Sequence, residues 1–251
     1  MIELKRRNCR FPANTRLLAG MASAIVAPII VLAVAIQASA QSPAVPYPKM
    51  AAIDRYLMTP DAEVASAKSA APESVSKDAD VLVLDQHGYR TAIKGRNGFV
   101  CAVQRSWTAE LDDPDFWNPK LRAPTCFNPA AARSFLPRVV TRTNLVLAGK
   151  TKEQLAAGMS AAFEAKEIPA IEPGAMAYML SKQGYLNTRD GHWHPHIMIW
   201  VPQAEPEGWG ANLPGSPIFG SADHTDRVSV FYIPVAKWSD GSADSSGGGS
   251  H

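Results

Sequence analysis

The sequence lacks a strong excess of charge of either sign. Its 251 residues contain 25 lysines and arginines against 23 aspartates and glutamates. Five of the basic residues and one acidic residue fall within residues 1–40, which leaves 20 against 22 in the rest of the chain, a net of −2. A nucleic-acid binder needs a basic stripe or patch. None is present, so we expect no nucleic-acid partner.

Long apolar runs are also scarce. The run from Met21 to Ile36 follows a basic head and precedes an Ala-x-Ala pattern at residues 38–40, which is the order of a secretory signal peptide. A membrane span needs about 20 apolar residues, and Pro28 interrupts this run, although an uncleaved anchor is the alternative. We expect residues 1–40 to be a signal peptide and the protein to be periplasmic or secreted. No stable membrane span should remain after cleavage.

Cysteine is rare. Only Cys101 and Cys126 lie beyond the predicted leader. In an oxidising compartment such a pair predicts one disulfide, which would contribute about 3 kcal/mol by closing its loop. The alternative is a nucleophilic thiol paired with a histidine, and predicted export favours the disulfide.

Familiar catalytic signatures are missing. The sequence contains no Gly-x-Ser-x-Gly and no internal repeat. Residues 144–151 resemble a phosphate-binding loop, but Asn144 stands where the first glycine should be. Ser74 to Lys77 matches Ser-x-x-Lys without the partner motifs of penicillin-binding enzymes. We therefore assign no catalytic serine.

The pattern along the chain predicts an α+β fold: an antiparallel sheet with helices packed on one face, in a single compact domain. Residues 41–80 are expected to form an extended arm with short helices, residues 81–238 the globular domain, and residues 239–251, rich in serine and glycine, a disordered tail.

Within the globular domain, apolar runs and turn signals over 81–105 predict a three-stranded meander. Helices are expected over 129–182. One follows Pro129, one opens with a capping box at Thr151, and one begins near Pro173. Strands are expected again between 192 and 235.

Residues 192–201 contain the most informative pattern. Side chains of a strand alternate between faces, so one face would carry His192, His194, His196, Met198 and Trp200. The other would carry Trp193, Pro195, Ile197, Ile199 and Val201. The second face is continuously apolar, so we expect it to face the core and the imidazoles to face solvent or a cleft.

Histidines at alternate strand positions can bind a metal ion. Neighbouring ones lie about 7 Å apart, so two can converge on one ion, whereas three need a bend at Pro195. The candidate remote ligands are His224, Asp223, Asp226 and His87. Nitrogen and carboxylate ligands favour zinc, and a nearby methionine favours copper. The alternative is that the histidines have a structural or proton-transfer role.

A second candidate is the Gly- and Pro-rich stretch from Trp209 to Pro217. Trp209 could stack on a flat ligand, with Asn212 and Trp200 as further ligand-binding residues, and the alternative is an irregular connection. Two functions follow. One is an exported metal-binding protein, in one version a hydrolase that uses zinc-bound water. The other is a non-catalytic periplasmic protein that binds a small molecule or has a structural role.

Overall fold

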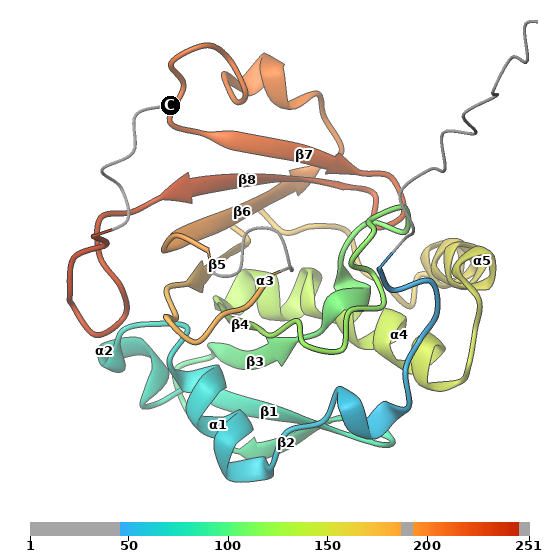
Figure 1. Cartoon of the computed structure of the whole chain (residues 1–251). Helices are drawn as coiled ribbons and strands as arrows, with labels where there is room; N and C mark the ends of the chain where they lie inside the picture. The colour runs from blue at the N-terminus through green and yellow to red at the C-terminus, as the bar shows by residue number, and fades with distance from the viewer. Residues whose placement is uncertain (1–45, 187–192, 246–251) are drawn as a thin grey trace, which may run out of the picture. The chain divides into compact units, whose positions relative to one another are not determined.

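The computed structural model describes residues 46–186 and 193–245, which contain a single mixed sheet of eight strands in the order β2-β1-β3-β4-β5-β6-β8-β7 (Figure 1). The strands are β1 (Asp80–Asp85), β2 (Gly88–Ile93), β3 (Val100–Gln104), β4 (Ala123–Phe127), β5 (Met176–Met179), β6 (His196–Pro202), β7 (Phe219–Asp223) and β8 (Val228–Pro234). The α-helices are α1 (Pro60–Lys68), α2 (Glu73–Ser76), α3 (Pro129–Ser134), α4 (Leu136–Leu147) and α5 (Lys152–Glu164). Short 3-10 helices are η1 (Ile53–Arg55), η2 (Ser106–Thr108) and η3 (Pro206–Trp209). The α+β prediction is confirmed.

The predicted meander over residues 81–105 is wrong in one respect. β1 and β2 form the expected hairpin, but β3 pairs parallel with β1 on its other side. The connection after β2 therefore crosses the start of β1, where Arg96 N–H donates to the carbonyl of Asp78. Gly95 permits this crossing, since a Cβ there would lie 2.3 Å from backbone atoms of Asp78 and Ala79. The sequence correctly predicts a turn between β2 and β3. The close approach at Gly95 takes the chain across β1, so that β3 pairs with β1 and not with β2.

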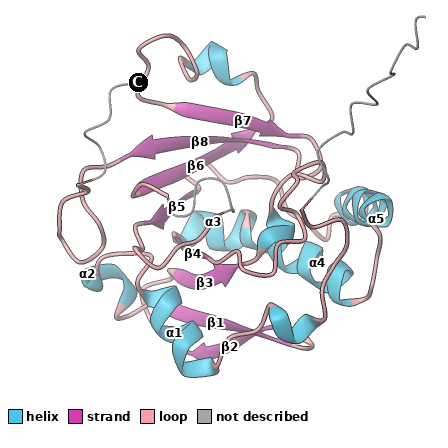
Figure 2. Cartoon of the chain, in the orientation of Figure 1, coloured by secondary structure: helices cyan, strands magenta, loops and turns pink. Residues whose placement is uncertain are grey.

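Helices cover both faces of the sheet rather than one (Figure 2). Ala67 of α1 packs with Val81 and Cys101 in one apolar cluster. Leu82, the neighbour of Val81, packs instead on the cluster that contains Phe135 and Val139. Because consecutive side chains of a strand point to opposite faces, α1 and the α3–α4 pair lie on opposite sides.

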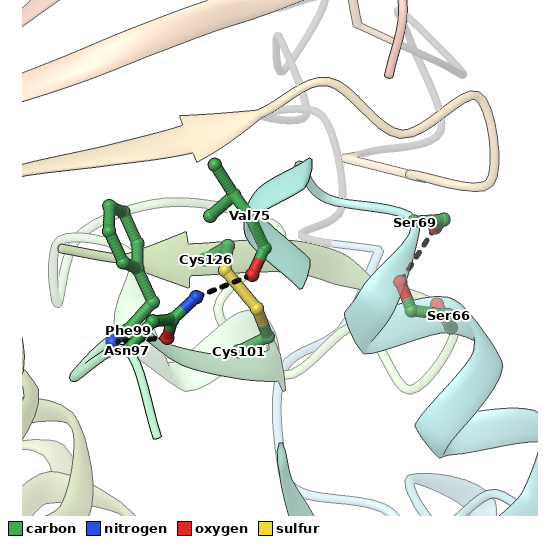
Figure 3. The surroundings of a disulfide bond; sticks show 7 residues. All are labelled: Ser66, Ser69, Val75, Asn97, Phe99, Cys101 and Cys126. Carbon is green, nitrogen blue, oxygen red and sulfur yellow. Dashed lines mark hydrogen bonds between the residues drawn. A yellow bond between two sulfur atoms is a disulfide. The ribbon is translucent and has the colours of Figure 1, made fainter. Parts of the chain in front are cut away.

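The disulfide joins β3 to β4 beneath α1 and α2 (Figure 3). Cys101 and Cys126 are direct cross-strand partners, with their sulfurs at bonding distance. Beside them, the Asn97 side chain donates to the carbonyl of Val75 and accepts from Phe99 N–H. The structure thus brings together the two cysteines that the sequence predicts to be bonded.

Residues 46–80, predicted as an arm, contact the sheet closely. Glu63 of α1 and Arg105 form an ion pair of 2.9 Å, and both side chains are fully buried. Glu63 also accepts the backbone N–H of Leu84, and Arg105 Nε donates to the carbonyl of Tyr56. These bonds fix the position of Arg105, which begins the loop at the candidate site.

Two of the predicted helix starts are confirmed. Asn128 caps α3 ahead of Pro129, and Thr151 and Gln154 form the capping box of α5. The predicted helix near Pro173 is wrong, because residues 176–179 form β5 between β4 and β6. Its methionine spacing suits a helix, and pairing with two neighbouring strands overrides that preference.

The first residues of the predicted tail, 239–251, contact the rest of the domain. Ser239 N–H donates to the carbonyl of Leu180, and Lys182 forms an ion pair with Asp240. Residues 246–251 and the predicted leader, 1–40, lie outside the described residues. Over residues 46–186 and 193–245, no helix is both long and apolar enough to span a membrane.

Candidate functional site

The face of β6 that carries His196 points into the protein. Met198 and Trp200 are buried, whereas Ile197 and Ile199 are partly exposed. The prediction that the isoleucine face is the core face is therefore wrong. α3 and α4 cover the face that carries His196, Met198 and Trp200. On this face Phe135 stacks on Trp200 with ring centroids 3.9 Å apart. The apolar pattern alone could not reveal which face these helices would choose.

A cavity of about 370 Å³ lies on this inner face. It is bounded by β3–β8, the residues after β3 and the start of α4, and much of its wall is apolar. Prominent apolar wall residues are Leu121, Phe135, Met179, Met198, Trp200 and Val230. The polar wall residues include Ser106, Glu110, His196, Ser221, Asp223 and Tyr232. Its volume is within the range of small-molecule sites.

Three carboxylates lie along the cavity wall. Asp226 accepts a 2.7 Å hydrogen bond from Arg142, and Asp223 lies 3.7 Å from the same guanidinium nitrogen. Burial raises the pKa of Asp226 to about 6, even though Arg142 opposes that change. Partial burial and the nearby Asp223 also raise the pKa of Glu110. Arg138 also acts electrostatically on Asp226, and its Nε donates to the carbonyl of that residue. The three carboxylates outnumber the guanidinium groups of Arg138 and Arg142.

His196 is half-buried and oriented by the backbone. Its Nδ1 lies 2.8 Å from the carbonyl of His194, which can only accept, so Nδ1 carries the proton. Nε2 is then the acceptor nitrogen of the neutral ring. Burial lowers the pKa of His196 and favours this neutral form. The ring makes edge contacts with Trp193 and Tyr232.

Ser106 contributes a further polar group. This residue is fully buried at the start of η2, lines the cavity, and its Oγ has no hydrogen-bond partner among the described residues. A buried hydroxyl without a partner costs free energy. A bound ligand or water that reaches Oγ would remove that cost.

The other predicted histidines lie elsewhere. His194 is exposed, and its Nδ1 is 2.7 Å from Asp244. His224 is exposed, and its Nδ1 is hydrogen-bonded to the side-chain amide of Gln203. His87 is an exposed turn residue. His192 lies outside the described residues. Within the part of the chain that the structure describes, no three His, Cys, Asp or Glu side chains gather to hold a metal.

The predicted ligand-binding residues are also separated. Trp200 lines the cavity, but Trp209 is exposed and contacts Phe231, whose side chain lies on the opposite face of β8 from Val230. Asn212 accepts from Gly220 N–H and donates to the carbonyl of Gly220. Its amide therefore imitates a neighbouring strand along β7, an edge strand, and protects that edge.

Sequence reasoning missed Ser106, Glu110 and Tyr232, and named Asp223 and Asp226 only as remote metal ligands. Tyr232 alternates with Val228 and Val230 along β8, and that pattern could have placed it on the inner face. No pattern in the sequence indicates that Ser106 and Glu110 close over this face.

Comparison with protein-family models, curated protein sequences and solved structures found no match to this chain.

Proposed function

We propose that this protein binds a small molecule with an apolar body in the inner cavity. The observation that carries the proposal is the cavity itself, about 370 Å³ in volume, in which an apolar wall adjoins a few polar side chains. Small-molecule sites typically have this composition: apolar surface provides affinity, and a few polar groups fix orientation.

The location of the cavity adds support. Much of its apolar wall, including Met179, Met198, Trp200 and Val230, lies on strands, which hold side chains more rigidly than loops do. The stack of Phe135 on Trp200 holds one wall, and the buried ion pair of Arg105 with Glu63 holds the start of another. We also propose that binding occurs outside the cytoplasm, on the basis of the signal-like residues 1–40 and the cysteine pair.

The experiment is a titration of the purified protein with N-phenylnaphthylamine, a neutral apolar dye that fluoresces strongly away from water. We expect saturable binding. Val230→Phe, which adds bulk at the cavity wall, should weaken dye binding about tenfold or more. Ile233→Phe adds the same kind of bulk on the opposite face of β8 and should change it less than twofold.

Melting temperature identifies variants that fail to fold. Absence of saturable dye binding to the unaltered protein would contradict the proposal. So would unchanged binding in a folded Val230→Phe.

A further inference from the structure

The hydrogen-bond donors and acceptors of the cavity wall differ in how many already have a partner within the protein. Most of the strong donors already have partners inside the protein. Arg105 donates to the carbonyls of Tyr56 and Val103 and to the carboxylate of Glu63. The amide nitrogen of Gln104 donates to Thr125.

The same pattern extends to two other wall residues. The hydroxyl of Thr108 donates to the carbonyl of Arg105, and His196 Nδ1 donates to the carbonyl of His194. The donors of these four residues are thus consumed by backbone and side-chain acceptors, whereas the hydroxyl of Ser106 has no partner among the described residues.

Acceptors, in contrast, remain. A carboxylate offers about four lone-pair sites and no donor, and Glu110 and Asp223 both line the cavity. Asp223 uses one oxygen to accept Asp226 N–H. Neutral His196 adds Nε2 as an acceptor. A ligand that satisfies this wall must supply donors.

Charge favours the same kind of ligand. Glu110, Asp223 and Asp226 line the cavity, and Arg142 forms its ion pairs with the two aspartates. Asp112 and Asp113 lie close enough to Glu110 to act on its carboxyl electrostatically. The charge of Arg105 is matched by Glu63. Arg138 acts electrostatically on Asp226, but the five carboxylates outnumber the guanidinium groups of Arg138 and Arg142, so this end of the cavity is net negative.

A buried polar atom points to a ligand independently of the acidic residues. Ser106 lines the cavity, and its Oγ is buried without a hydrogen-bond partner in residues 46–186 and 193–245. A hydroxyl can accept a hydrogen bond from a ligand N–H.

We infer that the ligand is an apolar primary amine bound as its ammonium ion, with the charged group held by the carboxylates of Glu110 and Asp223 and the apolar part against Met198 and Trp200. This inference rests on the proposed function, since it names the chemical class of the molecule that the cavity takes.

The test uses three phenyl compounds of similar size that differ in charge: phenethylamine, phenethyl alcohol and hydrocinnamate. Each competes with N-phenylnaphthylamine for the purified protein at pH 7. We expect phenethylamine to displace the dye at a concentration about tenfold lower than the alcohol, and hydrocinnamate to be the weakest competitor.

Variants assign the preference to the carboxylates. Glu110→Gln, at an exposed residue, should weaken phenethylamine at least threefold and leave the alcohol within twofold. Asp223→Asn should have the same effect on the two compounds. Its amide oxygen can still accept Asp226 N–H, so the turn between β7 and β8 should be retained. Glu205→Gln, an exposed residue outside the cavity wall, is the matched control and should change neither compound.

The outcomes separate the two proposals. If the dye binds and the alcohol or the acid competes as well as the amine, the amine inference is overturned and the small-molecule proposal stands. An equal loss of amine and alcohol affinity in Glu110→Gln also overturns the inference. If the dye itself does not bind, the proposed function fails.

Discussion

Asp226 and Arg142 form an ion pair of 2.7 Å at the cavity wall, with side chains only 8% and 1% exposed. This pair joins the turn between β7 and β8 to α4 across the inner face. Desolvation of the carboxylate outweighs the attraction of the guanidinium, so burial raises the pKa of Asp226 to about 6.

This pKa predicts a pH dependence of stability. The folded protein holds the Asp226 proton more tightly than the unfolded chain, whose aspartates titrate near pH 4. The contribution of Asp226 to the free energy of unfolding should therefore fall as pH rises from about 4 to about 6, and then level off. Urea unfolding of the protein and of Asp226→Asn over this range measures that contribution as the free energy of unfolding of the unaltered protein minus that of the variant. This difference should fall as pH rises. A difference that stays constant or rises with pH would contradict the assignment.

The ion pair between Glu63 and Arg105 predicts a large effect on stability. Glu63→Ala leaves Arg105 buried and unpaired, which costs about 3–5 kcal/mol. Glu73→Ala, at an exposed residue of α2, should cost less than about 0.5 kcal/mol. Chemical denaturation with the disulfide intact gives both values, and similar small values for the two variants would show that the pair does not hold α1.

Asn212 is predicted to protect the β7 edge. Asn212→Ala removes the two bonds to Gly220 and should destabilise the protein by about 1–3 kcal/mol, with concentration-dependent association in light scattering. Asn212 has a φ of 59°. Asn212→Gly keeps that backbone conformation accessible but also lacks the amide. If the glycine variant behaves like the unaltered protein, backbone strain and not the edge contact explains the alanine effect.

The metal hypothesis stays a prediction. Among the described residues, His194 pairs with Asp244 and His196 lines the cavity, and His192 lies outside those residues. A bound zinc or copper ion should survive dialysis and raise the melting temperature, and His194→Ala should abolish it. Elemental analysis of protein purified without chelator decides this, and absence of metal with unchanged melting would contradict the hypothesis.

The sequence predicts features that depend on neighbouring residues better than features that depend on contacts between distant segments. Local chemistry was sufficient for the capping box at Thr151 and for the turn between β1 and β2. It failed where distant segments decide, as at β5, whose methionines suit a helix until β4 and β6 pair with them. The strand at His196 was located correctly, but its inner face was not. That choice depends on Phe135, some 60 residues earlier in the sequence.

The central claim is that a small molecule enters the inner cavity, and the methyl groups of methionine test it most directly. Met179 and Met198 line the cavity, whereas Met159 of α5 is fully buried in a separate cluster with Ala162 and Ile168. In NMR spectra of protein labelled with carbon-13 at the methionine methyls, added N-phenylnaphthylamine should shift the Met179 and Met198 signals saturably and leave Met159 unchanged. Single Met→Leu variants assign the signals. The absence of any shift at saturating dye, or shifts at Met159 as large as at Met198, would contradict the account.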